Sequence, residues 1–270
     1  MEAKHLCGTI DQEGHLVKPL GEQMAEFPLP PMHAKALLIS HEFDCSIEML
    51  TIIAMLQIQN VFVFPTGQKH KAELMKRRFS VEEGDHLTML NIYTNFEKNN
   101  KSPKWCADHY LNYRGVIRAS EIRAQLSRFL QKYKIPMKTC RDVIGMDFAD
   151  RIRRCLVAGF FNNAAKLHHT GVYKTVRENY TLRIYMGSAL MVIYNEVLQD
   201  SMRDITVIEP EWLYELAPHF YEFGTLKTLN SKTPKSLQKD QDQIKRHRLS
   251  FLMGDVLHDE KLNQFYVKFD

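Results

Sequence analysis

The residues best suited to chemistry are arginines and amides that recur along one stretch of the chain, between Trp105 and Lys134. Cations held at regular spacing on a rigid element can contact successive phosphates of a nucleic acid. Amide side chains among them can donate hydrogen bonds to sugars or base edges. The candidate RNA-binding residues are therefore Asn112, Arg114, Arg118, Gln125 and Arg128.

The spacing predicts one long helix over 105–134 that positions these side chains. An apolar stripe repeats every three or four residues, and a cationic stripe with the same spacing lies about 100° around the axis. Segment 101–134 holds eight Lys or Arg residues against two acids. We expect a helix that packs on a domain and presents positive charge, although a core helix with a merely solvated face fits equally. The apolar stripe is Gly115, Ala119, Ile122, Leu126, Phe129 and Tyr133, and the cationic one is Arg114, Arg118, Glu121, Gln125, Arg128 and Lys132.

Motifs for self-contained catalysis are absent from the sequence. It has no GxxxxGK[ST] loop for phosphates, no DEAH box for Mg²⁺, and no GxSxG or HExxH motif. Neighbours such as Asp85 and His86 do not face each other on a helix, so a dyad is not expected there. His168 and His169 lack accompanying ligands and are interpreted as surface residues. We expect no catalytic residue, cofactor or metal site in this chain.

Composition limits the class of protein. The formal net charge of +4 permits an acidic partner without requiring one. Five cysteines, an odd number without a CxxC, favour a reducing intracellular compartment. There is no apolar run long enough for a membrane span and no secretory signal at the N-terminus.

The first half of the chain reads as helices. A β-hairpin is predicted over 5–20, as the end of a domain whose earlier part is missing, and an all-helical domain over 25–135. Asp44 or Ser46 is expected to cap the second helix, and Asp85 the fourth. A linker is expected over 136–150. The predicted helices cover 32–40, 47–59, 68–79, 86–97 and 105–134.

The second half reads as a helix over 151–165, then short strands, a helix over 211–221 opened by Pro210, and a flexible basic tail over 225–250. Closely spaced strands predict a small β-barrel. Its Tyr173, Tyr180 and Tyr185 could stack bases if exposed. The fold class is thus α+β and multidomain. The predicted strands are 172–177, 180–186, 188–198 and 203–209.

Six stretches, in order, resemble the C-terminal region of the DEAH-box RNA helicases, and most closely a spliceosome-associated member. They cover about four-fifths of the chain, so the resemblance is specific. The barrel departs from the family at 184–188 and 199–201, where its loops are shorter. The matching stretches are 16–38, 53–65, 79–96, 105–126, 154–165 and 209–221.

The resemblance implies a domain order: a winged-helix tail over 1–24, a helical ratchet (helicase-associated) domain over 25–145, an OB-fold over 151–222 and a basic tail over 223–270. In the family these domains wall a channel for single-stranded RNA beside two RecA-like domains, which bind ATP and Mg²⁺. The implied role is therefore an accessory module in nuclear pre-mRNA splicing, without ATPase activity of its own.

A protein-interaction module is the alternative. The family's RecA domains, or a G-patch protein of the spliceosome, could be its partner, without independent RNA binding. We rate G-patch binding lower, because only the end of the winged helix is present. Phe62, Phe64 and Leu74 would be the exposed apolar contacts on the RecA side.

Overall fold

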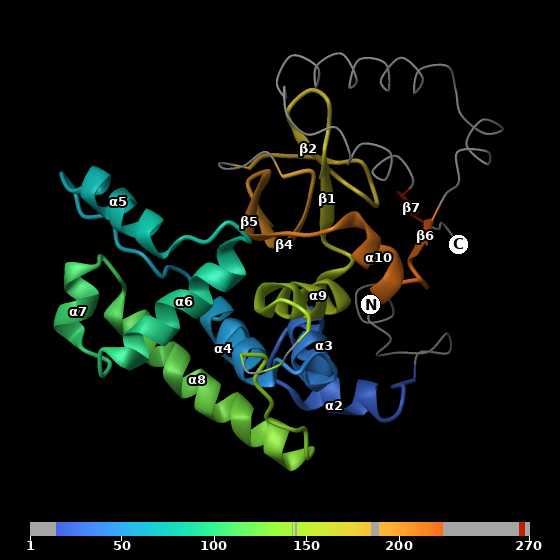
Figure 1. Ribbon diagram of the computed structural model, residues 1–270, viewed down its shortest axis with the longest axis horizontal. Coiled ribbons are helices and arrows are strands. Elements are labelled where there is room, and N and C mark those ends of the chain that lie inside the picture. Colours follow the sequence, from blue (N-terminus) through green and yellow to red (C-terminus); the bar gives the residue numbers. More distant parts are fainter. Residues whose placement is uncertain (1–14, 142, 144, 185–188, 224–264, 268–270) are drawn as a thin grey trace. The chain divides into compact units, whose positions relative to one another are not determined.

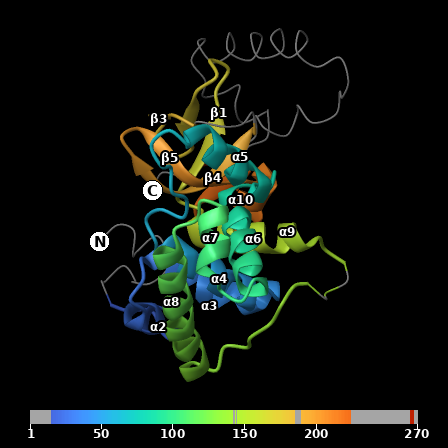
Figure 2. The same ribbon diagram turned by 90° about the vertical axis from the view of Figure 1, so that its left-hand side faces the viewer.

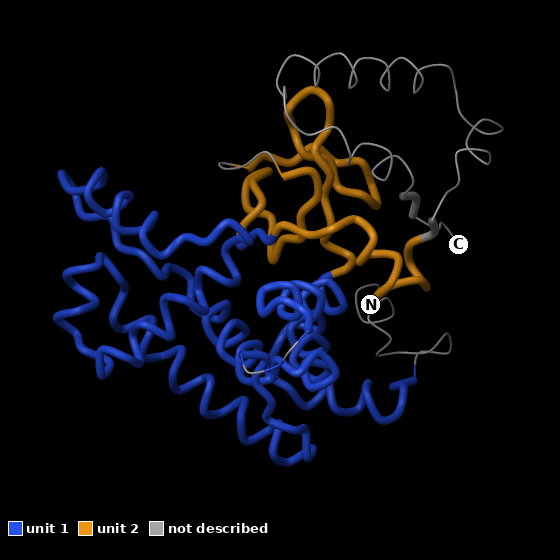
Figure 3. The backbone as a smooth tube through the Cα atoms, in the orientation of Figure 1, with its two compact units in different colours: residues 1–160, 204–206 blue, residues 161–203, 207–270 orange. Residues whose placement is uncertain are grey.

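A computed structural model describes residues 15–141, 143, 145–184, 189–223 and 265–267 (Figure 1). The chain forms two compact units (Figure 3). The helical unit contains residues 1–160 together with Asp204–Thr206, and the β unit contains 161–203 and 207–270. The α+β, multidomain fold class is confirmed. The predicted hairpin over 5–20 and the tail over 225–250 fall largely or entirely outside the described residues.

The helical unit is built around one helix that is buried almost all the way round. Nine of the eleven residues of α4 are buried, as its near-continuous apolar sequence predicts. Helices α3, α6 and α8 pack on it, and Figure 2 shows α8 running beside α4. The described helices of this unit are α2 (Leu20–Glu26), α3 (Pro31–Ile39), η1 (Ser40–Phe43), α4 (Ser46–Leu56), α5 (Lys69–Phe79), α6 (Asp85–Lys98), α7 (Pro103–Asp108), α8 (Tyr113–Lys132) and α9 (Phe148–Phe160).

The predicted caps of α4 and α6 are wrong, because the acids bind elsewhere. Cys45 stands at the N-cap of α4 without a side-chain hydrogen bond. The carboxylate of Asp44 instead forms ion pairs with Lys138 at 2.7 Å and with Arg151 at 3.2 Å. The hydrogen bond from Lys138 holds the pKa of Asp44 below its usual range. Gly84 precedes α6, and the carboxylate of Asp85 accepts a hydrogen bond from the backbone N–H of Ile205.

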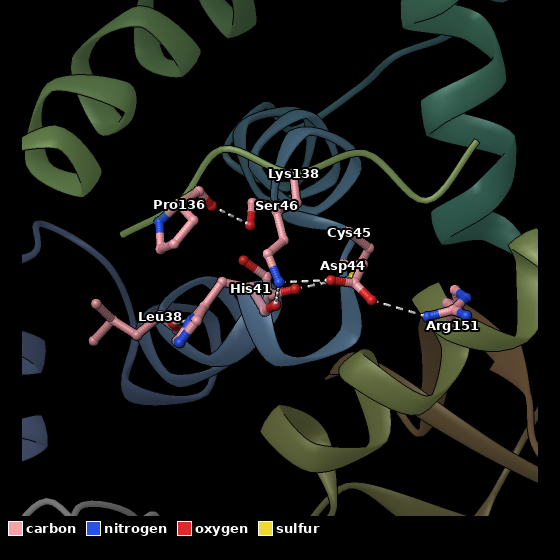
Figure 4. A network of polar contacts seen from close by, with 9 residues as sticks. Leu38, His41, Asp44, Cys45, Ser46, Pro136, Lys138 and Arg151 are labelled. Atoms are coloured by element: carbon pink, nitrogen blue, oxygen red, sulfur yellow. Dashed lines mark hydrogen bonds and ion pairs between the residues drawn. The ribbon is translucent and has the colours of Figure 1, made fainter. Parts of the chain in front are cut away.

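Residues 136–138 are held by polar contacts and are not a loose linker (Figure 4). The Ser46 hydroxyl donates to the carbonyl of Pro136 at 2.8 Å. Lys138 donates to the carbonyl of His41 as well as to Asp44. Next to them, the Thr139 hydroxyl donates to buried Glu48 at 2.6 Å. The segment after α8 is thereby fixed to the start of α4.

Helices α3 and α9 approach closely because a glycine lies between them. An added Cβ on Gly159 would stand 2.5 Å from the Cβ of Ala36. The thiol of Cys155, on the same helix, donates to the carbonyl of Ala36 at 3.4 Å. Helix α9 therefore belongs with the helices by packing. The boundaries predicted for the domains stay a prediction.

The β unit contains a five-stranded sheet in the order β3-β2-β1-β4-β5, in which β1 pairs antiparallel with β2 and β4, and β2 with β3. The edge strands also meet: Arg183 bridges Ser201, and the N–H of Met202 donates to the Arg183 carbonyl at 3.0 Å. This contact curls the sheet toward a barrel. The strands are β1 (Ala164–Leu167), β2 (Tyr173–Thr175), β3 (Thr181–Leu182), β4 (Met191–Leu198) and β5 (Ser201–Val207).

The predicted helix over 151–165 is too long: α9 ends at Phe160, and residues 164–165 begin strand β1. Helix α10 (Pro210–Leu216) begins at Pro210 as expected and ends earlier than predicted. β6 (Tyr221–Phe223) and β7 (Phe265–Val267) form a second, two-stranded sheet. Among the described helices, none combines the length and the apolar character of a membrane span.

Candidate nucleic-acid interface

The candidate interface begins where the predicted long helix breaks. α7 ends at Asp108, and α8 starts at Tyr113. Between them Tyr110 adopts a left-handed backbone with φ of 56°, which interrupts the helical hydrogen bonds. One continuous helix over 105–134 is therefore a wrong prediction, and only its second part carries the arginines.

The break is set by pairing with a distant segment. The N–H of Asn112 donates to the carbonyl of Val61 at 2.8 Å. The N–H of Val63 donates to the carbonyl of Tyr110, also at 2.8 Å. The Tyr110 hydroxyl donates to Gln68, the residue before α5, at 2.7 Å. These long-range backbone hydrogen bonds therefore override the local helix propensity of residues 109–112.

Asn112 is the cap of α8. Its side-chain oxygen accepts the N–H of Gly115 at 3.1 Å, and its amide nitrogen donates to the carbonyl of Asn60 at 3.0 Å. Capping of this kind satisfies a backbone donor that has no partner within the helix. The amide is engaged within the protein, and its role as a donor to RNA stays a prediction.

The buried face of α8 is rotated from the predicted stripe. Val116, Ala119, Leu126 and Leu130 are buried. On a helical wheel with 100° per residue, the centre of these four buried positions lies nearly opposite the arginines. It is rotated by about 60° from the centre of the predicted apolar stripe. Gly115, Ile122 and Phe129 lie at the edge of the contact, and Ala119 and Leu126 were placed correctly.

Arg123 lies on that buried face and was not singled out from the sequence. Its Nε donates to the hydroxyl of Thr51 at 2.9 Å, and its guanidinium lies 5.8 Å from the ring centre of Tyr93. Thr51 in turn donates to the carbonyl of Ile47. This arginine therefore ties α8 to α4 and α6. The sequence signal for this structural role is the position of Arg123 on a helical wheel, 180° from Arg114.

The remaining arginines of α8 form an open cationic face. Arg114, Arg118 and Arg128 are exposed, and none has an ion pair with another residue in the part of the chain that is described. Gln125 is exposed on the same face. Lys132, at its end, is bound to Glu26, which raises the pKa of the lysine. We call Arg114, Arg118, Gln125 and Arg128 the α8 face.

A second basic surface lies on α5. Lys69, Lys71, Arg77 and Arg78 are exposed and form no ion pair within the described residues. Apolar side chains accompany them: Leu74 is 48% exposed and Phe64, just before the helix, 43%. The prediction of exposure was wrong for Phe62, which packs on Phe79 with ring centres 6.4 Å apart.

The aromatic residues expected to stack bases differ in exposure. Tyr173 is 3% exposed, and its hydroxyl donates to the carbonyl of Ala189 at 2.5 Å, so it is a core residue and not a stacking platform. Tyr180 is 64% exposed and is available for stacking. Tyr185 lies outside the described residues.

The histidine pair takes an arrangement that a strand would not allow. His168 and His169 have ring centres 3.9 Å apart because they stand at the turn after β1. No cluster of three or more His, Cys, Asp or Glu residues that could hold a metal is found in the described part of the chain. The four cysteines there are buried and free.

Two family models match the chain. Residues 30–89 match "Helicase associated domain (HA2), ratchet-like", and residues 152–221 match "Oligonucleotide/oligosaccharide-binding (OB)-fold". The α8 face lies between the two matches. Both domains are accessory domains of helicases, as the sequence resemblance implied.

Curated relatives match most of the chain. It is 53% identical over 240 residues to the "Probable ATP-dependent RNA helicase DHX35 homolog" of Caenorhabditis elegans, and 49% over 245 residues to human "Probable ATP-dependent RNA helicase DHX35". The "Pre-mRNA-splicing factor ATP-dependent RNA helicase prp22" of Schizosaccharomyces pombe is 38% identical over 244 residues. These alignments cover 86%, 87% and 87% of this chain, but 32%, 34% and 20% of the relatives. The chain therefore spans between a fifth and about a third of the length of these proteins.

Proposed function

Because this chain belongs to the DEAH-box RNA helicases and corresponds to their C-terminal region, we propose that it forms part of the wall of a single-stranded RNA channel. The observation that carries the proposal is the α8 face. Three arginines at helical spacing are exposed and unpaired within the described residues, on a helix whose opposite side is anchored by Arg123. Rigid cations of this kind bind the RNA backbone without reading its sequence.

The motor for such a channel is proposed to lie in RecA-like domains that hold ATP and Mg²⁺. A role in pre-mRNA splicing is taken from the name of one relative, and a nuclear location is inferred from that role; both belong to the same proposal. The alignments reach only part of each relative, so activity of the whole helicase is a property of a longer protein. Within this function the chain grips or guides RNA and does not hydrolyse ATP.

The test is RNA binding by the full chain. A labelled single-stranded oligouridylate should bind weakly, with affinity that falls as salt rises, because phosphate contacts release counterions. Arg114→Ala with Arg118→Ala should lower that affinity while the far-UV circular dichroism spectrum and thermal midpoint stay unchanged. The matched control is Arg77→Ala with Arg78→Ala, which removes the same charge from α5.

The outcomes separate a specific face from general charge. If the double variant on α8 loses more affinity for RNA than the double variant on α5, the result supports the channel-wall function. Equal losses would show that net charge alone governs binding. No binding at low salt would overturn the proposed function.

A second candidate function is docking on RecA-like domains, with a G-patch protein as a less favoured partner. Exposed Phe64 and Leu74 favour it, since exposed apolar surface marks contact sites. Pull-down with a separately produced RecA-domain pair, compared between the wild type and Phe64→Ser with Leu74→Ser, tests it. Equal recovery of both proteins would remove this candidate.

A further inference from the structure

A serine directly after α5 is preceded by two arginines. Arg77 and Arg78 stand three and two positions before Ser80, and Val81 follows it. A basophilic protein kinase recognises this order of residues, because acidic side chains in its substrate cleft pair with the two guanidinium groups and an apolar pocket takes the residue after the acceptor. No other serine or threonine of the sequence has arginine at both of these positions. The segment therefore has the residue order of a kinase substrate.

The structure leaves these residues accessible to an enzyme. Arg77 and Arg78 are exposed, and neither forms an ion pair within the described residues. Ser80 and Val81 are partly exposed. The Ser80 hydroxyl donates to the carbonyl of Lys76 at 3.1 Å, which is a local bond within one helical turn. The oxygen that would accept a phosphoryl group is thus held only by the end of its own helix among the described contacts.

The end of α5 is suited to local opening, which a kinase requires because its cleft holds the substrate extended. Ser80 already has an extended backbone with ψ of 136°, and its N–H closes the last turn by donating to Lys76 at 3.2 Å. Figure 1 shows α5 at one end of the helical unit. Two of its eleven residues, Ala72 and Phe79, are buried, against nine of eleven in α4. Few buried contacts lower the free energy of local opening, and Phe79 is the anchor that residues 77–81 must release.

We propose that Ser80 is the phosphorylation site of a basophilic protein kinase, and that the phosphate cancels positive charge on α5. The Ser80 Oγ attacks the γ-phosphorus of Mg²⁺-bound ATP. The new O–P bond forms as the bond from that phosphorus to the ADP oxygen breaks, and the hydroxyl proton passes to a carboxylate of the kinase. The kinase supplies the ATP site and the base. The inference is independent of RNA binding and goes beyond the proposed function.

The phosphate would change the charge of a strongly basic helix. α5 carries five Lys or Arg residues against one acid, Glu73. A phosphoserine adds about 1.5–2 negative charges at pH 7, which is roughly half of the net positive charge of α5. Positions three and four apart are neighbours along a helix, so Lys76 and Arg77 lie within reach of a phosphate on Ser80. The phosphate cannot donate to the Lys76 carbonyl, and it exchanges that hydrogen bond for two cationic partners.

The first experiment incubates the full chain with Mg²⁺-ATP and the catalytic subunit of cyclic-AMP-dependent protein kinase, and mass spectrometry locates the phosphate. We expect one phosphate on Ser80 and none at this position in Ser80→Ala. Arg77→Gln with Arg78→Gln should slow the transfer on the order of a hundredfold, because two charge-assisted contacts with the kinase are lost. The matched control is Lys69→Gln with Lys71→Gln, which removes the same charge from the same helix and should keep the wild-type rate.

A second measurement tests the ion pairing of the phosphate. Phosphorus NMR of the phosphorylated chain gives the second pKa of the phosphoserine, which is about 6 without partners. A neighbouring cation favours the dianion and lowers this pKa. The pKa at Ser80 should therefore be lower in the wild type than in Lys76→Met, which keeps both arginines that the kinase reads. Lys69→Met, at the other end of α5, should give the wild-type pKa.

Three results would overturn the proposal. Transfer to a peptide of residues 73–85 but not to the folded chain would mean that the end of α5 stays closed. Transfer to Ser250, which has Arg248 two positions before it but His247 three before it, in place of Ser80 would assign the kinase to another segment. Equal pKa values in the wild type and Lys76→Met would remove the cancelling of charge on α5.

The supporting result is phosphate on Ser80 of the folded chain, transfer that depends on Arg77 and Arg78, and a phosphoserine pKa that rises in Lys76→Met. This result stands whether or not the arginine variants of α8 lose affinity for RNA, so failure of the proposed function and failure of the phosphorylation site are distinguishable.

Discussion

Nδ1 of His86 lies 2.7 Å from the hydroxyl oxygen of Thr206, and both residues are fully buried. The two are 120 positions apart in the chain. The second ring nitrogen, Nε2, has no hydrogen-bond partner among the described residues. Burial, with a contribution from His33, lowers the pKa of His86 to about 3.

The buried histidine predicts acid sensitivity. The unfolded chain binds a proton at this residue near pH 6.5, whereas the folded chain binds it near 3, so its contribution to stability is full above pH 6.5 and is lost as the pH falls toward 3. Between pH 7.5 and pH 5 this amounts to about 2 kcal/mol. Urea unfolding at both pH values should show the loss.

His86→Gln provides the comparison for that measurement. It should be less stable at pH 7.5 but lose less stability between the two pH values. His70→Gln, on the exposed surface of α5, is the control and should keep the wild-type difference. Equal pH dependence in the wild type and His86→Gln would rule out His86 as the source.

The cap of α8 predicts a graded effect. Asn112→Ala removes the acceptor for Gly115 and the donor to Asn60, and should lower the free energy of unfolding by about 1 kcal/mol or more. Asn112→Asp keeps an acceptor oxygen and should recover part of the loss. The measurement is urea unfolding of all three proteins, and indistinguishable midpoints would contradict the capping role.

Close packing of α3 and α9 predicts a coupled pair. Gly159→Ala places a methyl against Ala36, and overpacking of this kind costs about 1–3 kcal/mol. Ala36→Gly in the same protein should relieve part of that cost. A double-mutant cycle measured by thermal unfolding gives the coupling. Strict additivity of the two changes would show that the helices move apart freely.

Arg123 and its neighbours on α8 predict opposite phenotypes. Arg123→Met removes the hydrogen bond to Thr51 and the contact with Tyr93, and should cost on the order of 1–2 kcal/mol of stability. Its effect on the salt slope of RNA binding should be small. A large change in slope with unchanged stability would place Arg123 on the RNA side.

Arg128 completes the test of the α8 face. Adding Arg128→Gln to Arg114→Gln and Arg118→Gln should reduce the salt slope by about 2 in total, because three phosphate contacts at about 0.7 each are removed. Titrations of the labelled oligouridylate over a sodium chloride series give the slope. A slope equal to that of the wild type would mean that the three arginines are merely solvated.

Parts of the fold follow local rules, and the sequence located them well. The helix opened by Pro210, the helix that became the apolar α4 and the series of closely spaced short strands were correctly predicted. The domain types were identified by resemblance, since the order of six stretches is more specific than any single motif. What these predictions share is that neighbouring residues decide them.

The errors arose where distant residues compete with local preference. Asp44 and Asp85 have good capping chemistry. Their carboxylates instead bind the side chain of Lys138 and the backbone N–H of Ile205, respectively. Tyr173 has the chemistry to stack bases, but the sheet buries it. Residues 109–112 have a helical pattern that pairing with 60–63 breaks.

By itself the sequence determined that this chain carries cations at helical spacing, an apolar helix for a core, and no motif for ATP hydrolysis, because residue type and spacing are properties of the chain alone. The tertiary structure decided which arginine is structural and which are open, since exposure depends on what packs opposite. It also set Lys166 against Lys174, because register between strands is fixed by backbone hydrogen bonds that no spacing along the chain reveals.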